Sequence, residues 1–428
     1  MSRFFYSLLL YLISPLAMVR LFLRSRKAPE YWQRKSERFG FFNLPPSGKP
    51  VIWVHSVSMG ETIASAPLVK QLQKRYPDHR ILITTMTPTG SAQVRKIHGD
   101  SVEHIYASYD LPGAVKRFLD KVKPVVAIVI DTELWPNTIA ACHKRRIPVL
   151  IVNARLSERS ARGYGRFSFL TRPMLKQIDR VAAQNDETAR RFLAIGLPEK
   201  QLCNTGSIKF DLDVSPEVIA AGKALREKWQ EGMGDDIHIL VAASTHEGED
   251  QQVLDAFKTI LADVPKMRLL LVPRHPERFN RVYQLIQDNQ LSVVRHSLGT
   301  QPQETTRVIL GDTMGEMMKL FAASDIAYVG GSLVPTGGHN MLEPAALNLP
   351  VLSGPHVFNF AEISDSLVKA GGLKIVSSSE ELAQETIRLI QNNNEYEEMS
   401  RHAGEFVSAN RGALDRVLTL VGQLVNTE

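Results

Sequence analysis

Short, continuous apolar runs alternate with helical patterns along most of the chain. The stretches PVIWVHSVS at 50–58 and VVAIVI at 125–130 are two such runs. Strands that are covered on both faces of a parallel sheet are apolar throughout, whereas half-exposed strands alternate between apolar and polar residues. The pattern therefore predicts an α/β protein whose parallel sheets are covered by helices on both faces.

The pattern stops and restarts near residues 204–214, which predicts a domain boundary. The chain has 428 residues, and about 100–200 residues per domain makes two domains the natural expectation. We predict an N-terminal membrane element at 1–28, a first doubly wound domain at 29–208 and a second one at 209–428. Ligands of doubly wound sheets bind beyond the carboxyl ends of the strands, and the polar clusters of this sequence follow predicted strands.

The N-terminal segment has the composition of a membrane element. Residues 4–19 contain no charged side chain, and Arg20, Arg24, Arg26 and Lys27 follow them. A cleavable signal peptide has its basic residues before the apolar core, and the positive-inside rule places the following chain in the cytoplasm. We predict that the segment holds the protein at the inner leaflet, where anionic lipids attract the basic residues. The segment either spans the membrane or lies in its interface, and the alternative is a buried helix of the first domain.

The cysteine count and the net charge exclude some classes of protein. The two cysteines, Cys142 and Cys203, are too few for a disulfide framework or a cysteine-rich zinc site. A formal net charge of +6 is modest for this length and gives no reason to expect nucleic acid as a partner. Basic residues concentrate in the first half of the chain, where anionic partners are expected.

Three strand-end clusters in the second half indicate a nucleotide site. Arg274 and His275 follow one predicted strand, Gly315 and Glu316 follow another, and a glycine-rich loop precedes Glu343. An arginine can bind two phosphate oxygens at once, glycines let the backbone approach a phosphate, and a carboxylate can accept hydrogen bonds from both ribose hydroxyls. Taken singly, these residues could instead form a tight turn, a surface ion pair or a helix cap. No GxxxxGK[ST] or strand-linked GxGxxG motif is present, which argues against nucleotide hydrolysis and dinucleotide redox chemistry.

The first half offers a general base and an anion-binding loop. Gly60 and Glu61 follow a predicted strand at the start of a helix, where a carboxylate can take a proton from an attacking hydroxyl. The simpler interpretation of Glu61 is a first-turn acid favoured by the helix dipole. Asp131 and Glu133 follow another strand, with Trp135 as packing or a stacking surface. The arginine-rich stretch at 155–172 suits an acceptor that carries phosphates.

Together these stretches resemble the 3-deoxy-D-manno-octulosonic acid (Kdo) transferases of lipopolysaccharide synthesis. The matching stretches are VHSVSMGET, DTELWPN, NARLSERS, GSIKFD, PRHPERF, GDTMGEM and GGHNMLEP, in this order along nearly the whole chain. The resemblance implies a GT-B glycosyltransferase fold, which consists of two Rossmann-like domains facing across a cleft, with the last helix packing back on the first domain. It also implies anchoring at the cytoplasmic face of the cell inner membrane.

The resemblance further implies the substrates and the site residues. The donor would be CMP-Kdo and the acceptor the lipid A precursor, lipid IVA, a tetraacylated and bisphosphorylated disaccharide. Glu61 would be the base. The implied CMP contacts are Arg274, His275, Met314, Gly315, Glu316, Asn340 and Glu343, and the acceptor-side residues are Ser58, Gly60, Asp131, Glu133, Arg155 and Arg159. One departure is Asp131, which stands where relatives often have the longer glutamate.

The implied reaction is a direct displacement with inversion at the anomeric carbon. We predict no cofactor and no required metal ion. The string DLD at Asp211–Asp213 matches the DxD motif that places a metal ion in many sugar transferases, but it lies in the inter-domain stretch and is interpreted as a chance match. Three alternatives remain open: a GT-B transferase that uses a UDP-sugar, a nucleotide-sugar epimerase, and a non-catalytic membrane-binding protein.

Overall fold

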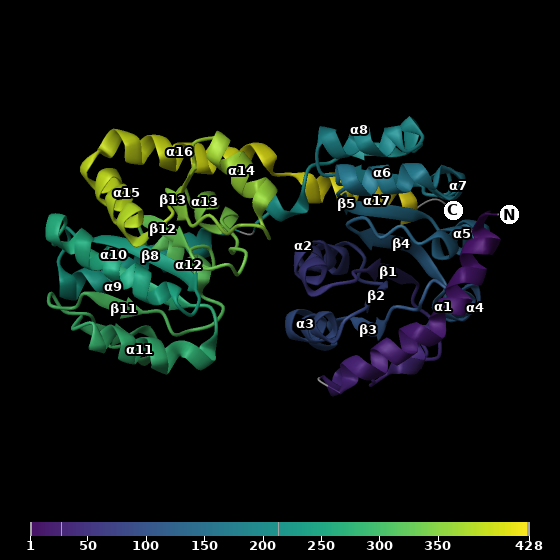
Figure 1. Cartoon of the computed structure of the whole chain (residues 1–428), viewed down its shortest axis with the longest axis horizontal. Coiled ribbons are helices and arrows are strands. Elements are labelled where there is room, and N and C mark those ends of the chain that lie inside the picture. Colours follow the sequence, from purple (N-terminus) through teal and green to yellow (C-terminus); the bar gives the residue numbers. More distant parts are fainter. Residues whose placement is uncertain (1, 27, 213, 426–428) are drawn as a thin grey trace. The chain divides into compact units, whose positions relative to one another are not determined.

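The computed structural model describes residues 2–26, 28–212 and 214–425, and the chain divides into two compact units (Figure 1). Unit 1 comprises Met1–Asp211 together with Arg411–Glu428, and unit 2 comprises Leu212–Asn410. Each unit has its own parallel sheet and its own hydrophobic core. The predicted architecture of two doubly wound parallel sheets is thereby confirmed.

The sheet of unit 1 has the order β3-β2-β1-β4-β5-β6-β7 in the described residues, and neighbouring strands pair in parallel. Its strands are β1 Val51–His55, β2 Arg80–Thr85, β3 Glu103–Tyr106, β4 Pro124–Ile130, β5 Val149–Ala154, β6 Arg180–Ala183 and β7 Leu202–Asn204. The strand order reverses between β1 and β4. In a doubly wound sheet this switch point is where a ligand binds, and the carboxyl ends of these two strands lead to Glu61 and Asp131.

Helices cover both faces of this sheet. Successive residues of a strand point to opposite faces, so Ile52 and Val54 enter one core while Val51 and Trp53 enter the other. The helices are α2 Met59–Arg75, α3 Pro88–His98, α4 Pro112–Val122, α5 Pro136–Lys144, α6 Glu158–Arg166, α7 Ser168–Leu175, α8 Asp186–Ala194 and α17 Ala413–Val425. This burial on both faces explains why the strands read as unbroken apolar runs.

The C-terminal helix α17 belongs to unit 1, although the chain passes through unit 2 before reaching it. Val417 and Val421 are buried in the core that contains β1 and α2. Asp211 accepts hydrogen bonds from the backbone N–H groups of Gly412 at 2.6 Å and Leu414 at 2.7 Å. The carboxylate of Asp211 therefore fixes the start of α17, which is a structural role. Asp213, the other acid of the DLD string, lies outside the described residues.

The sheet of unit 2 has the order β10-β11-β9-β8-β12-β13-β14 in the described residues, again parallel. Its strands are β8 His238–Thr245, β9 Met267–Pro273, β10 Val293–Arg295, β11 Val308–Leu310, β12 Ile326–Val329, β13 Val351–Ser353 and β14 Leu373–Ile375. Its helices are α9 Pro216–Met233, α10 Glu249–Asp263, α11 Phe279–Asp288, α12 Met317–Ala322, α13 Leu342–Ala346, α14 Ala361–Lys369, α15 Ser379–Gln391 and α16 Asn393–Asn410. Adjacent strands β9, β8 and β12 form its centre.

The N-terminal helix α1, Ser2–Ser25, lies beside α5 and α7 with most of its surface exposed (Figure 1). Tyr6 donates a hydrogen bond to Asp110 at 3.0 Å, and the backbone N–H of Gly113 donates one to Tyr11 at 3.2 Å. Only 6% of its most apolar window is buried, and the helix is long and apolar enough to cross a membrane. The alternative of a buried core helix is therefore wrong. Of the basic residues that follow the apolar stretch, Lys27 lies outside the described residues.

Candidate functional site

Glu61 lies in the first turn of α2, directly after β1. Ser58 is the N-cap of this helix. The backbone N–H of Val57 donates to Glu61 Oε2 at 2.6 Å, and the hydroxyl of Ser58 donates to Oε1 at 2.8 Å. These two hydrogen bonds fix the carboxylate, while Gly60 beside it is exposed. The sequence motif SMGET thus places an oriented carboxylate at a strand end.

The environment of Glu61 favours its protonated form. Burial raises the pKa of Glu61 to about 7, and the negative charges of Asp131 and Glu133 add to the increase. The two hydrogen bonds lower the pKa but do not outweigh burial. Burial also raises the pKa of Asp131 and of Glu133. A carboxylate whose pKa lies near neutral pH can both take up and release a proton there, as a general base requires. The three acids predicted for unit 1 therefore interact electrostatically at the carboxyl edge of its sheet.

Asp131 is fixed by residues from two other segments. Asn153 at the end of β5 donates to Asp131 Oδ1 at 2.8 Å and accepts from Ser207 at 3.0 Å. Asp131 and Asn153 both have a φ of 58°, a conformation that costs a non-glycine residue roughly 1–3 kcal/mol and is often found at functional sites. The positive charges of Lys209 and Arg155 act on Asp131. This network holds the shorter acid in place.

Glu133 is oriented by an aromatic side chain. Trp135 donates from its ring nitrogen to Glu133 at 2.8 Å, and its ring meets His55 edge-on with the centroids 4.6 Å apart. Trp135 therefore packs in the unit and orients an acid. Arg155 and Arg159 lie at the end of β5 and on α6 with exposed side chains. The backbone of Arg155 is held by Thr132, whose hydroxyl oxygen accepts from its N–H at 3.0 Å.

In unit 2 the predicted nucleotide residues form two groups. In the first group, Asn340 donates a hydrogen bond to Glu343 at 3.1 Å. Burial raises the pKa of Glu343, and the hydrogen bond from Asn340 and the charge of Arg274 lower it by less. Within the described residues the guanidinium of Arg274 forms no hydrogen bond or ion pair, and Arg274 and His275 are both exposed. Glu343 lies in the first turn of α13, which has five residues. The expected helix is present but short.

The second group lies at the start of α12. Gly315 has a φ of 86° with open space where a side chain would be, and Met314 is 51% exposed. Glu316 pairs with Lys319 at 3.0 Å and with His296 at 3.4 Å. In the part of the chain that the structure describes, no hydrogen bond or ion pair joins this group to Arg274, Asn340 or Glu343.

The glycine-rich loop after β12 is held by a buried acid that the sequence analysis did not single out. Glu249, in the first turn of α10, is fully buried. It accepts from the backbone N–H groups of Gly331, Ser332 and Leu333 at 2.6–3.0 Å and from the hydroxyl of Tyr328 at 2.6 Å. Gly330 leaves no room for a side chain, since a Cβ there would lie 2.9 Å from Glu249. One carboxylate thus determines the shape of this loop.

Other residues at these strand ends were also missed. Asn153 and Lys209 stand in the stretches NARLSERS and GSIKFD, so their position after predicted strands was a usable signal. His246 and His339 follow β8 and β12 and contact one another. Glu249 has the sequence context of an ordinary first-turn acid, and nothing in the sequence marks it as buried. Among the described residues no group of histidine, cysteine and acidic side chains has the arrangement of a metal site.

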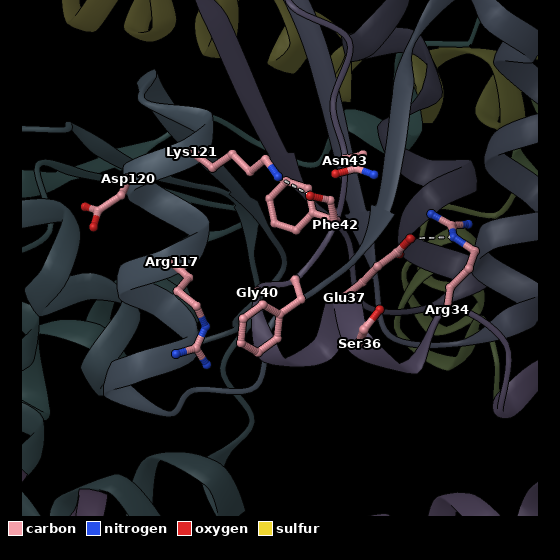
Figure 2. Close-up of a pocket in the computed structure, with 10 residues that line it drawn as sticks. Arg34, Ser36, Glu37, Gly40, Phe42, Asn43, Arg117, Asp120 and Lys121 are labelled. Atoms are coloured by element: carbon pink, nitrogen blue, oxygen red, sulfur yellow. Dashed lines mark hydrogen bonds and ion pairs between the residues drawn. The ribbon is translucent and has the colours of Figure 1, made fainter.

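A hollow in unit 1 is not lined by any of the predicted site residues (Figure 2). It has a volume of about 810 Å³ and charged walls. Its basic side chains already bind protein groups, since Arg34 donates to Glu37 at 2.7 Å and Lys121 donates to the carbonyl of Phe42. The hollow is therefore not the candidate site.

Comparison with known proteins covers almost the whole chain. Residues 33–212 match the family model "3-Deoxy-D-manno-octulosonic-acid transferase (kdotransferase)", and residues 223–406 match "Glycosyl transferases group 1". The chain is 45% identical over 426 residues to the 3-deoxy-D-manno-octulosonic acid transferase of Haemophilus influenzae, with 98% of both chains covered. It is 34% identical over 431 residues to that of Bordetella pertussis, again with 98% of each covered.

The likeness to solved structures extends to proteins with another activity. The UDP-GlcNAc 2-epimerase of Neisseria meningitidis superposes with a TM-score of 0.58 and 18% sequence identity, over 87% of this chain and 100% of the epimerase. Such a likeness shows the fold alone. Family membership rests instead on the full-length identity to the transferases. The chain belongs to the 3-deoxy-D-manno-octulosonic acid transferase family of glycosyltransferases.

Proposed function

We propose that this Kdo transferase moves Kdo from CMP-Kdo to the lipid A precursor with inversion at the anomeric carbon. The observation that carries the proposal is the position of Glu61, whose oriented carboxylate has a pKa raised to about 7 at the switch point of unit 1. Glu61 takes the proton of the acceptor hydroxyl as its oxygen attacks the anomeric carbon. The bond from that carbon to the phosphate oxygen breaks, and CMP leaves.

Unit 2 supplies groups that suit a cytidylyl donor. Arg274 offers a guanidinium without a protein partner in the described residues, which suits the phosphate of CMP or the carboxylate of Kdo. Asn340 and Glu343 suit the hydroxyls of the ribose. Met314, Gly315 and Glu316 lie in an open turn that suits the cytosine ring of CMP. His275, at the end of β9, completes this proposed donor set.

The acceptor side suits a phosphorylated lipid. Arg155 is exposed near Asp131, and Arg159 is exposed on α6. Both side chains suit the phosphates of the acceptor. Ser58 and Gly60 shape the start of α2 around the base. The apolar surface of α1 suits attachment to the cytoplasmic face of the inner membrane, where the acyl chains of the acceptor reside and anionic lipids attract the basic residues after α1.

The decisive experiment incubates the purified protein with CMP-Kdo and lipid IVA and weighs the lipid by mass spectrometry. We expect the mass of the acceptor to increase by that of Kdo, with CMP released and the anomeric configuration of the sugar inverted. Parallel reactions with UDP-sugars test the alternative donor. If the sugar of the nucleotide-sugar is epimerised when no acceptor is present, the protein is an epimerase. A Glu61→Gln variant that folds and retains full transfer contradicts the assignment of the base.

Metal independence is part of the proposal. Treatment with a chelator is expected to leave the rate of transfer unchanged, because Arg274 and hydrogen-bond donors take the place of a cation at the phosphate. Loss of activity with EDTA that Mg²⁺ restores would contradict this.

A further inference from the structure

Three histidines meet at the carboxyl ends of three adjacent strands in unit 2. His246 follows β8, His275 follows β9, and His339 lies in the loop after β12. The planes of the His246 and His339 rings are nearly parallel, at 10°, and their centroids are 5.1 Å apart. His275 meets His246 edge-on at 5.4 Å. Residues that are 93 positions apart in the sequence are thus neighbours because β8 and β12 pair in the sheet.

His246 and His339 form a hydrogen-bonded pair, which we call the histidine pair. Their Nε2 atoms are 2.8 Å apart, so one ring nitrogen carries a proton and the other accepts it. Two nitrogens that bind one tetrahedral zinc ion at ~2.1 Å would lie roughly 3.4 Å apart. The separation therefore fits a shared proton better than a common metal ion.

Charged and titratable side chains of both signs surround the histidine pair. Arg274, His275 and Arg278 face it, and Glu249 is the facing acid. Glu249 is occupied by the loop N–H groups and Tyr328, and Arg278 pairs with Asp250. Within the described residues, Arg274 has no such partner. The guanidinium of Arg274 is therefore the group at this site that an anion could pair with.

The free protein holds the histidine pair in its neutral state at neutral pH. Burial, then the neighbouring His246 and Arg274, lower the pKa of His339 to about 4. The pKa of His246 is lowered chiefly by burial as well. An anion bound beside the rings would oppose the effect of the neighbouring positive charges, because its charge favours the imidazolium form.

The backbone of the loop is shaped to receive the ring of His339. Gly331 has a φ of 69°, and a Cβ at this position would lie 2.9 Å from Cδ2 and 3.1 Å from Nε2 of His339. Only glycine lets the ring lie against the backbone here. Since Glu249 holds the N–H of Gly331, the loop, its acid and the histidine pair form one built arrangement.

We propose that the histidine pair is a phosphate subsite that takes up one proton from solvent when a phosphate monoester binds next to Arg274. The proposal rests on the proposed function, because the leaving group of that reaction is such a monoester. When the bond from the anomeric carbon to phosphate breaks, its electron pair stays on the phosphate oxygen. The phosphate changes from a monoanionic diester to a monoester with a second charge. The protonated pair donates a hydrogen bond to this charge, while Glu61 holds the proton of the acceptor.

Calorimetric titration of the full chain with CMP tests the subsite. Titrations between pH 6.5 and 8, in buffers of different ionisation enthalpy, are expected to show net proton uptake. The affinity for CMP should rise by up to about tenfold for each pH unit that the pH falls. Cytidine, which has no phosphate, should bind without uptake. CMP binding without net proton uptake in the unaltered protein overturns the proposal, and this measurement needs no variant.

Two substitutions test whether the proton that is taken up binds to the histidine pair. His246→Gln and His339→Gln should each make the affinity for CMP independent of pH over this range, whereas His238→Gln at the opposite end of β8 should leave the dependence unchanged. Uptake that persists in both variants also overturns the proposal. A parallel titration with UMP distinguishes the failure of the proposed donor from the failure of the proposed subsite. Proton uptake on binding UMP, with no binding of CMP, would contradict the cytidylyl donor and support the phosphate subsite. Binding of CMP without proton uptake would support the donor and contradict the subsite.

Discussion

Ser58 and Glu61 exchange hydrogen bonds in both directions. The Ser58 hydroxyl oxygen accepts from the backbone N–H of Glu61 at 3.3 Å and donates its own proton to Glu61 Oε1 at 2.8 Å. This reciprocal cap fixes the first turn of α2 and orients the carboxylate at the same time. The residue that we propose as the base is thus also part of the structure that starts its helix.

The pH dependence of the reaction should report the raised pKa of Glu61. Its carboxyl group is protonated below a pKa of about 7, and only the ionised form can accept a proton. We expect kcat/KM to fall below neutral pH, by at most about tenfold per pH unit, because proton uptake by the histidine pair would offset part of the loss. A pH–rate profile measured with CMP-Kdo checks this. An acidic limb below pH 5 would contradict the raised pKa.

Removing the charge of Glu133 should move this limb to lower pH. The negative charges of Asp131 and Glu133 raise the pKa of Glu61, so Glu133→Gln removes one of the causes and leaves the side chain shape unchanged. The matched control is Asp120→Asn, since Asp120 lies on α4 and pairs with Lys116 and Arg145. The control should leave the profile unchanged, and equal shifts in both variants would show that the effect is not local.

Glu61→Gln should stabilise the protein more at pH 8 than at pH 5. A raised folded-state pKa means that folding favours the protonated acid, so the contribution of Glu61 to stability is present below its unfolded pKa and is lost as pH rises through about 7. Glutamine mimics the protonated form at every pH. Thermal unfolding at the two pH values measures the difference, and a larger gain at pH 5 would reverse the sign that we expect.

Glu249→Gln should destabilise unit 2 and weaken nucleotide binding together. Its carboxylate accepts from three loop N–H groups and from Tyr328, and charged hydrogen bonds of this kind contribute about 1.5–3 kcal/mol each. We expect a loss of at least ~2 kcal/mol in chemical denaturation. Tyr328→Phe removes one donor and should cost about 1 kcal/mol. Similar losses in the two variants would mean that the loop does not depend on the charge.

The exposed face of α1 should bind membranes. Leu12 and Leu16 are 69% and 67% exposed, so replacing both with glutamate should leave the fold intact and weaken binding to anionic vesicles by more than about tenfold. Leu298→Glu is the matched control, because Leu298 is 71% exposed in unit 2. Flotation with vesicles measures both. Unchanged flotation of the double variant would exclude α1 as the anchor.

The sequence predicted those features that depend on local order. Apolar runs indicated the strands, and the stretch VHSVSMGET indicated a helix start after a strand with Glu61 in its first turn. Contacts set by strand pairing were not predictable in this way. His246 and His339 are neighbours only because β8 lies beside β12, and Glu249 is buried only because the loop after β12 folds over it. A single sequence contains no record of which strands pair.

The return of α17 to unit 1 has a consequence for the order in which the protein assembles. Residues 212–410 are inserted between the two segments of unit 1, and α17 packs against α2, the helix that carries Glu61. During translation unit 2 can complete its core while one face of the first sheet still lacks α17. The residues of α17, which are translated after unit 2, therefore complete unit 1, so a chain that is cut short before α17 keeps the loops of unit 2 but loses a helix that packs against α2.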